Sequence, residues 1–397
     1  MSDVPHLRFP EFSGEWYSYP LTDFMSFKNG MNPDAKRFGR GIKFISVMDI
    51  LNNQFICYDN IRASVEVIEG DIETYGVNYG DILFQRSSET LEDVGQANVY
   101  LDRKPAVFGG FVIRGKSKGN YHPVFFRYLL ASPTARKRII VKGAGAQHFN
   151  IGQDGLSRVC LNIPSIQEQE KIAKLFECVD TRIATQNKII EDLKKLKSAI
   201  SKQVFAQEPN GWSRLDTLFS KGKAGGTPTS TNKEYYNGEI PFLSINDITK
   251  QGKYVRYTEN HLSQSGLENS SAWVVPKYSL IMSMYASVGL VTINEIPITT
   301  SQAMFAMQLK DKDLLDYLYY YLSYFKYRHI HKYLETGTQS NINADIVRGI
   351  MIPTYGHSRN MEIASTLQGI DVKIDNELSV LKLFNRQKNY LLSQMFI

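Results

Sequence analysis

The residues best suited to chemistry in this sequence are basic, amide and hydroxyl side chains in short polar loops. Lysine and arginine bind phosphate oxygens, while amide, hydroxyl and imidazole groups pair with the edges of bases. These loops therefore permit a nucleic-acid interface, and the alternatives are loops that are simply solvated and side chains that only cap their own loops. The candidates are Lys28, Asn29, Arg86, Ser87, Ser88, Lys142, Gln147, His148 and Asn150 in the first half, and Lys221, Lys223, Thr227, Tyr285, Ser287, Gln339, Ser340, Asn341 and Asn343 in the second.

The same search finds no arrangement that is typical of catalysis or of cofactor binding. The glycine-rich run 223–228 lacks the Gly-Lys-Ser/Thr ending of a phosphate-binding loop, and no Gly-x-Gly-x-x-Gly follows a predicted strand. Pro33-Asp34 could open a nuclease carboxylate site, but no Asp/Glu-x-Lys follows at a workable distance. No two prolines are adjacent, which excludes the Asn/Asp-Pro-Pro-aromatic element of amino-methyltransferases. We therefore expect no catalytic residue, metal ligand or cofactor in this chain.

The composition is that of a globular protein with a mild basic excess. The 397 residues suffice for two or three domains, and the formal net charge of +6 permits an anionic partner without requiring one. The first residues lack signal-peptide features, and the most apolar stretch, 278–293, is too short and polar to span a bilayer. We expect a cytoplasmic protein without membrane association. Cys57, Cys160 and Cys178 have no metal-ligand or redox spacing, so we expect them to be reduced and buried.

The chain contains two copies of a unit of about 200 residues, which indicates duplication of a whole domain rather than a solenoid array. Residues 42–50 align with 240–248 at an offset of 198, residues 145–147 align with 337–339, and Trp16 aligns with Trp212. Near the end of each copy the offset is 191 without a gap, so this segment has the same length in both. The pairs that define it are Ile172 with Ile363, Ala173 with Ala364, Asp180 with Asp371, Ile183 with Ile374, Lys197 with Lys388, Gln203 with Gln394 and Phe205 with Phe396.

These ungapped segments are predicted to be long amphipathic helices. The first should begin after Pro164, with Ser165 and Glu168 forming a capping box, and continue for about 38 residues, or about 57 Å. Its apolar residues recur three and four apart, with breaks at Gln186 and Lys197, as in a coiled coil. Two ordinary core helices are the alternative, although few core helices are so long. The apolar stripes run through Ile172, Phe176, Val179, Ile183, Ile190, Leu193, Ile200 and Val204, and through Ile363, Leu367, Ile370, Ile374, Leu378, Leu381, Phe384, Leu391 and Met395.

Strand-like runs precede a helical segment in both halves, which predicts α+β domains. The predicted strands are 42–47, 81–84 and 106–113, then 240–245, 279–284 and 288–293, and the helical segments are 123–141 and 312–334. We expect two globular domains of mixed α and β structure, joined by two long helices that pair as an antiparallel coiled coil with internal pseudo-two-fold symmetry. The predicted division is 1–164 for the first domain, 165–207 for its helix, 208–356 for the second domain and 357–397 for its helix.

Several segments resemble the specificity (S) subunit of type I restriction–modification enzymes. They are 225–230 (GGTPTS) with 235–244 (YYNGEIPFLS) and 247–248 (DI), 79–87 (YGDILFQRS), and 162–173 (NIPSIQEQEKIA). The resemblance covers the whole chain in the order domain, helix, domain, helix. One departure is that residues 354–362 (TYGHSRNME) stand where the first copy has its Glu-Gln-Glu-Lys entry into the helix.

The resemblance implies a non-catalytic subunit that reads double-stranded DNA as a target-recognition protein. In that family each globular domain reads one half of a split site and the paired helices set the gap between the halves. The helices also dock two modification subunits, which bind S-adenosylmethionine and methylate adenine, and restriction subunits complete the nuclease. Gln147 and Gln339 are our first choices for base contacts. The alternatives are a stand-alone DNA-binding or scaffolding protein without a methyltransferase partner, and an enzyme active on its own.

Overall fold

The structure, a computed structural model, describes residues 4–145, 147–333 and 341–397. The chain forms two compact units, one made of Met1–Asn187 with Ser379–Ile397 and the other of Lys188–Leu378. Each unit therefore contains one globular domain and a part of each long helix. This division differs from a sequential one because each domain packs against segments of both helices.

The globular part of the first unit contains two four-stranded sheets, one antiparallel and one mixed. The four-stranded antiparallel sheet has the order β2 (Met25–Asn29), β10 (Val112–Ser117), β6 (Ile82–Gln85), β8 (Ala97–Val99). The mixed sheet has the order β4 (Ala63–Val65), β3 (Phe38–Ile45), β9 (Ala106–Phe108), β5 (Gly76–Val77), with β3 and β9 parallel. Two short pairs join β1 (Tyr17–Pro20) to β12 (Cys160–Ile163), and β7 (Ser87–Ser88) to β11 (Phe149–Asn150).

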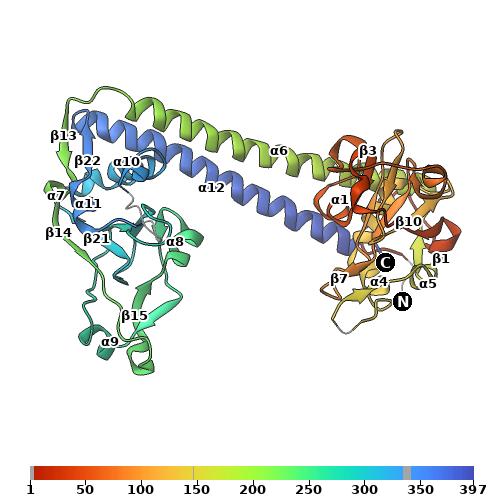
Figure 1. The fold of residues 1–397 in the computed structure, drawn as a ribbon, viewed down its shortest axis with the longest axis horizontal. Helices are drawn as coiled ribbons and strands as arrows, with labels where there is room; N and C mark the ends of the chain where they lie inside the picture. The colour runs from red at the N-terminus through yellow and green to blue at the C-terminus, as the bar shows by residue number, and fades with distance from the viewer. Residues whose placement is uncertain (1–3, 146, 334–340) are drawn as a thin grey trace. The chain divides into compact units, whose positions relative to one another are not determined.

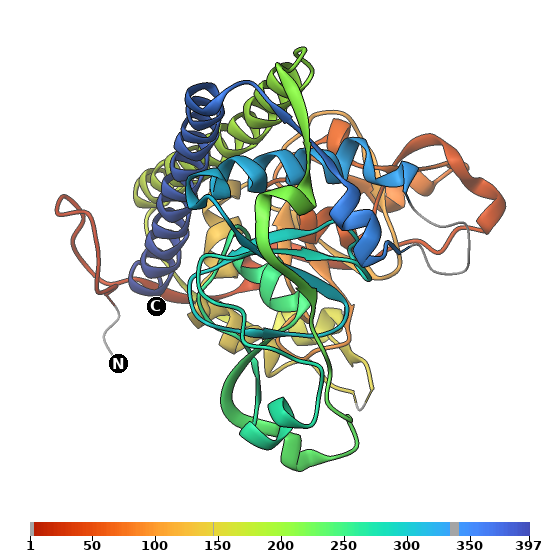
Figure 2. The ribbon, with the colours of Figure 1, turned by 90° about the vertical axis from the view of Figure 1, so that its left-hand side faces the viewer.

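The second unit repeats this plan with one more strand in the first sheet and one fewer in the second. Its five-stranded sheet has the order β14 (Phe219–Ala224), β21 (Met304–Leu309), β18 (Leu280–Ser283), β19 (Val291–Asn294), β16 (Tyr254–Val255). The three-stranded sheet has the order β17 (Asn260–Leu262), β15 (Tyr236–Leu243), β20 (Thr299–Thr300), and β13 (Gly211–Arg214) pairs with β22 (Met351–Thr354). Figure 2, in which this unit faces the viewer, shows α10 (Leu315–Arg328) along one side of the strands.

The helices follow the predicted positions with local differences. The expected helix at 123–141 is two helices, because Pro133 occupies the first position of a new one and the Ser132 hydroxyl caps it. The expected strand at 106–113 is likewise divided, by Gly109-Gly110, into β9 and β10. The α-helices of the domains are α1 (Val47–Asn52), α2 (Asp71–Tyr75), α3 (Pro123–Ala131), α4 (Pro133–Ile140), α5 (Gln153–Ser157), α7 (Leu215–Leu218), α8 (Ile245–Gln251), α9 (Gln264–Glu268), α10 and α11 (Ala344–Gly349). The 3₁₀ segments are Leu21–Asp23, Ala35–Arg37, Tyr58–Asn60, Lys233–Tyr235, Lys312–Leu314 and Ile330–Lys332.

The two long helices are α6 (Ile166–Phe205) and α12 (His357–Gln394), both labelled in Figure 1. Within the first unit, Phe176 of α6 contacts Phe396 just beyond the end of α12, while Asp180 contacts Lys388. Residue numbers thus rise along α6 as they fall along α12, which is the antiparallel arrangement expected. Most residues of the predicted apolar stripe are buried or half-buried. The prediction is wrong for Leu378, whose side chain is 42% exposed.

The start of α6 confirms half of the predicted capping box. The Ser165 hydroxyl accepts a hydrogen bond from the Glu168 amide at 3.4 Å. The Glu168 carboxylate, which is almost fully buried, instead receives two hydrogen bonds from the Arg8 guanidinium at 2.7 and 2.8 Å. The amide of Leu7 donates to the Gln394 carbonyl at 3.0 Å. The N-terminal segment therefore ties the first turn of α6 to the last turn of α12.

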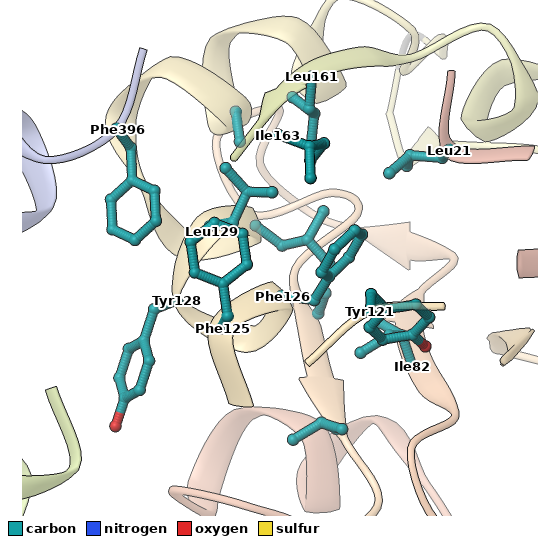
Figure 3. Packing of buried hydrophobic residues seen from close by; sticks show 14 of the residues in the cluster. Leu21, Ile82, Tyr121, Phe125, Phe126, Tyr128, Leu129, Leu161, Ile163 and Phe396 are labelled. Atoms are coloured by element: carbon teal, nitrogen blue, oxygen red, sulfur yellow. The ribbon is translucent and has the colours of Figure 1, made fainter. Parts of the chain in front are cut away.

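The aromatic core of each domain closes over the C-terminal end of one long helix. In the first unit Phe396 lies 5.6 Å from Phe125 and 6.4 Å from Trp16, measured between ring centroids, and Figure 3 shows it facing the α3 side chains. In the second unit the equivalent residue, Phe205, lies 5.3 Å from Tyr321 and 5.2 Å from Tyr324 of α10. Each domain is therefore completed by the helix that follows the other domain in the sequence.

The structure confirms the duplication but corrects one proposed equivalence. Ser46 with Asp49, and Ser244 with Asp247, form capping boxes at the starts of α1 and α8, at the predicted offset of 198. In the strand pairs, Tyr17 lies opposite Ile163 as Gly211 lies opposite Thr354. Trp212 therefore corresponds to Ser18 and not to Trp16, since the offset between the copies is 194 at this strand and a gap separates it from residues 42–50, where the offset is 198. The burial agrees, since Trp16 is 2% exposed and Trp212 is 55% exposed.

The expected burial of the cysteines is wrong for two of the three. Cys160 and Cys178 are exposed and Cys57 is half-buried, and all three are free thiols. Cys160 lies on β12 and Cys178 on the outer face of α6, where neither strand nor helix buries its side chain. In the part of the chain that the structure describes, no helix combines the length and apolar character needed to cross a membrane.

The capping carboxylate of α8 gives the first prediction. Asp247 is fully buried and accepts hydrogen bonds from the Ser244 amide at 2.8 Å, the Ser244 hydroxyl at 2.6 Å and the Glu259 amide at 3.0 Å. Asp247→Ala should lower the free energy of unfolding by about 2–3 kcal/mol because buried donors lose their acceptor. Urea unfolding of the purified chain measures this. The control Asp345→Ala removes a carboxylate whose side chain is 89% exposed, so equal losses in both variants would contradict the prediction.

Candidate nucleic-acid interface

A backbone pairing brings two separate polar loops of the first unit together. Strand β7 pairs with β11, so that Ser87 lies opposite Asn150 and their side chains are hydrogen-bonded. The Ile151 amide also donates to the Arg86 carbonyl at 2.9 Å. Four of the predicted residues, Arg86, Ser87, Ser88 and Asn150, therefore form one surface although about 60 residues separate them in the sequence.

The loop between α4 and β11 presents the residues expected to read bases. Ala144 and Asn150 exchange two backbone hydrogen bonds, of 2.9 and 2.8 Å, which close the loop at its base. Lys142, Gln147 and His148 are exposed on this loop. The Asn150 amide donates to the His148 carbonyl at 3.1 Å, so Asn150 serves partly as the internal brace that the alternative interpretation expected.

Lys28 and Asn29 are the last two residues of strand β2, and their side chains have different neighbours. The Asn29 side chain lies within hydrogen-bond distance of the Gln153 amide group, just beyond β11. The Lys28 ammonium lies 5.5 Å from the ring centroid of Tyr75 in α2. Because successive strand residues point to opposite faces, the structure groups Asn29 with the loop residues and separates Lys28 from them.

The second unit repeats the backbone of this surface. The Ile342 amide donates to the Met284 carbonyl at 3.1 Å, which is the equivalent of the bond from Ile151 to Arg86. Tyr285, which is 40% exposed, precedes two residues in the left-handed region, Ala286 and Ser287, with φ of 34° and 54°. The Ser283 hydroxyl donates to the Ser287 carbonyl at 2.8 Å and holds this turn. Tyr285 and Ser287 are therefore displayed where the first unit displays Ser87 and its neighbours.

The remaining candidates of the second unit have structural contacts of their own. The Lys221 ammonium lies 4.3 Å from the Trp273 ring centroid, and that of Lys223 donates to the Ser271 carbonyl at 3.4 Å. The Thr227 hydroxyl is bonded to the Gln302 side chain, and both Lys221 and Thr227 remain exposed. Gln339 and Ser340 lie outside the described residues.

Asn341 and Asn343 are the last two candidates of the second unit. Asn341, the equivalent of Asn150, is half-buried. The Asn343 carboxamide oxygen accepts from the Ile346 amide at 2.9 Å and so caps α11. For Asn343 the capping alternative is thus the observed role.

An exposed aromatic side chain beside the first surface escaped the sequence analysis. Phe111 is 69% exposed, its carbonyl accepts from the Arg86 amide at 2.9 Å, and it lines a cavity of about 420 Å³ with Phe44 and Met48. In the major groove of a duplex, an exposed phenylalanine ring can contact the methyl group of thymine. Phe111 directly follows Gly109-Gly110 in the turn between β9 and β10, and this position in the sequence could have indicated an exposed ring.

The equivalent backbone positions of the two units carry different side chains. The Met284 amide donates to the Ala303 carbonyl at 2.7 Å, as the Arg86 amide does to that of Phe111. Arginine is thus replaced by methionine and phenylalanine by alanine on the same framework. Among the described residues, no group of three or more His, Cys, Asp or Glu side chains could hold a metal ion. The arrangement provides polar and aromatic side chains for contact with a large partner on two similar frameworks.

Comparison with known proteins agrees with this arrangement. The family described as type I restriction modification DNA specificity domain matches residues 13–195 and again 209–381. A Methanocaldococcus jannaschii protein named as the specificity subunit of type I restriction enzyme MjaX is 24% identical over 391 residues, which covers 92% of this chain and 89% of that protein. The specificity subunit of the Haemophilus influenzae type I restriction enzyme HindI is 22% identical over 385 residues, covering 77% and 82%.

Solved structures share the fold over the whole chain. The S subunit of a type I restriction–modification system from M. genitalium superposes with a TM-score of 0.57 at 14% identity, covering 99% of both chains. A chain from a structural study of type I R-M complex assembly and conformational transition gives a TM-score of 0.63 at 15% identity, covering 98% of both. The family matches this chain twice and covers most of the chain's length. The chain therefore belongs to the specificity subunits of type I restriction–modification systems, which are non-catalytic proteins that confer DNA specificity.

Proposed function

We propose that this chain reads a bipartite site in double-stranded DNA, with one half-site for each globular domain. The observation that carries the proposal is the repeated loop framework, in which Ile151 binds Arg86 and Ile342 binds Met284 through equivalent backbone hydrogen bonds. A shared framework gives both domains the same approach to a groove, while different side chains select different bases. Lysine and arginine in these loops would hold phosphates, and Gln147, His148 and Phe111 would contact bases.

We further propose that the long helices set the distance between the half-sites. Helix α6 has 40 residues and α12 has 38, so they are about 60 and 57 Å long. The segment has equal length in both copies, whereas insertions and deletions fall in the domains. A spacer under selection for its length has this pattern, and B-DNA repeats every 34–36 Å, so helices of this length could hold two readers more than one turn apart.

The outer faces of these helices fit the docking of two modification subunits, one for each copy. Leu383 is 60% exposed, Tyr390 59%, Val372 54% and Leu196 48%. Large apolar side chains on the polar face of a helix mark a binding surface for another protein. The modification subunits would bind S-adenosylmethionine and methylate adenine, and restriction subunits would join them. A stand-alone DNA-binding or scaffolding protein is the alternative, and it predicts no such partner.

Replacing Gln147 should alter recognition at one half-site only. In the complex assembled with its modification subunits, Gln147→Ala should reduce discrimination among base substitutions in the first half-site by about 1–3 kcal/mol and leave the second unchanged. Adenine methylation of duplexes with single substitutions measures both. Gln207→Ala, an exposed glutamine after the end of α6, is the matched control. Unchanged discrimination at the first half-site would remove Gln147 from the interface.

Lengthening both helices should change the gap between the two DNA half-sites and leave the half-site sequences unchanged. Lys188 and Ser379 are equivalent positions, 191 residues apart. Insertion of four residues at both sites adds about 6 Å to each helix, so the preferred gap should grow by about two base pairs. Methylation of a duplex series with fixed half-sites and variable gap measures this. A change in the half-site sequences without a change in the gap would contradict the spacer model.

A charged residue on the exposed helix face should weaken assembly with the modification subunit. Leu383→Asp should reduce the affinity for that subunit by at least about tenfold, because a carboxylate would be buried in an apolar interface. Co-purification and titration calorimetry measure the stoichiometry and the affinity. Asn385→Asp adds the same charge two residues away at an exposed polar position and serves as control. A wild-type chain that captures no such subunit would favour the stand-alone alternative.

A further inference from the structure

A tyrosine, an aspartate and a lysine from three different elements meet in the first unit. The Tyr128 hydroxyl of α3 donates to the Asp180 carboxylate of α6 at 2.7 Å. The Lys388 ammonium of α12 lies 2.6 Å from the other oxygen of that carboxylate and 5.6 Å from the Tyr128 ring centroid. We call these three residues the first clamp. It connects the globular domain to both long helices at one point.

The second unit contains the same three residue types in the same relation. The Tyr320 hydroxyl of α10 donates to the Asp371 carboxylate of α12 at 2.7 Å. The Lys197 ammonium of α6 lies 2.5 Å from the other oxygen of that carboxylate and 5.1 Å from the Tyr320 ring centroid. These residues form the second clamp. The helix that provides the carboxylate in one clamp provides the lysine in the other.

The two clamps occupy equivalent positions of the duplication. Asp180 and Asp371 are 191 residues apart, as are Lys197 and Lys388, and Tyr128 and Tyr320 are 192 apart. The neighbouring residues are different. The Gln54 amide donates to Asp180 at 3.2 Å, whereas the Lys253 ammonium donates to the Tyr320 hydroxyl at 3.0 Å. The triad has thus been kept in both copies while the side chains around it have diverged.

The clamps are partly withdrawn from water, which strengthens their interactions. The Asp180 side chain is 7% exposed and that of Asp371 24%, and each lysine is 27% exposed. Burial, together with the adjacent carboxylate, raises the pKa of both the Tyr128 and Tyr320 hydroxyls, so that each keeps the proton it donates. A hydrogen bond between a charged acceptor and a well-placed donor is short and strongly directional.

The apolar contacts between each domain and the helices cannot by themselves fix the orientation of that domain. Phe396 and Phe205 pack against aromatic rings, and such burial stabilises a contact without fixing one orientation. We propose that the two clamps are positioning devices, which fix the orientation of each recognition domain on the helix pair and so make the gap between half-sites exact. This inference rests on the proposed function for its consequence in DNA reading, but the clamping itself does not.

The main test removes only the donor hydroxyl. Tyr128→Phe with Tyr320→Phe keeps both rings. A second pair of variants, Asp180→Asn with Asp371→Asn, keeps the side-chain shapes but removes both carboxylate charges. In the complex with modification subunits, the preference for the best gap over a gap one base pair longer should fall by about tenfold, the value of one hydrogen bond to a charged group. Discrimination among half-site sequences should stay unchanged. A purely structural role would lower methylation equally at every gap length, and that result would overturn the proposal.

Two matched controls and one conservative pair complete the series. Tyr327→Phe removes an exposed hydroxyl from α10, the helix that carries Tyr320. Lys195→Met breaks an exposed ion pair with Glu191, and Lys195 lies two residues before Lys197. Both should keep the wild-type gap profile. Lys197→Arg with Lys388→Arg keeps both charges and should retain most of the gap preference, whereas methionine at both positions should lose it. Loss of the profile in the controls would equally refute the assignment.

A distance measurement tests the clamp without any DNA. Spin labels at Gln264→Cys in the second domain and Asn376→Cys on α12, both exposed sites, are introduced after Cys57, Cys160 and Cys178 are changed to serine. Pulsed electron resonance should give a narrow distance distribution that broadens at least twofold with Tyr320→Phe. An unchanged width refutes the clamp. A wild-type complex without any gap preference refutes the proposed function instead, so the two failures are distinguishable.

Discussion

An amphipathic helix of forty residues must bury its apolar stripe away from water. The fold depends on how the two long helices bury their stripes. Each helix pairs with the other and with a globular domain, so that Ile172, Phe176 and Val179 are buried in the first unit and Ile363 and Leu367 in the second. The last residues of each helix then complete the core of the domain that belongs to the other copy. Neither copy could bury its apolar surface alone, which makes the two halves of the chain interdependent.

Regular features of the structure could be predicted because their causes are local. The three-four spacing of apolar residues predicts both long helices to within two residues of their observed starts, and Ser165 begins α6 as expected. The Ser-x-x-Asp pattern explains the equivalent starts of α1 and α8. Errors arose where a local pattern was incomplete, as with Pro133, which divides a predicted helix, and Trp212, where a gap in the alignment was misplaced.

The candidate interface could be predicted only in its composition. That Ser87 lies beside Asn150 depends on a strand pairing between residues 63 apart, for which the sequence contains no local signal. The outcomes for Asn343 and Lys28 have local causes instead, because the Asn343 side chain caps a short helix and Lys28 lies on the opposite face of its strand from Asn29. Tyr128 and Tyr320 were also missed, although their spacing of 192 residues differs by only one from the offset of 191 in the helices. An internal duplication therefore contains long-range information that residue types alone do not.

The duplication separates what a recognition protein must keep from what it must be able to change. Backbone hydrogen bonds hold the loops at Arg86 and Met284 in the same arrangement whatever their side chains are, because amide and carbonyl groups are common to all residues. Side chains at the tips of these loops can then vary without loss of the framework. Residues that connect domain to helix have the opposite requirement, since a tyrosine, a carboxylate and an ammonium group are each needed for the contact. Divergent loops and identical clamps within one chain are therefore consequences of the same division between reading and positioning.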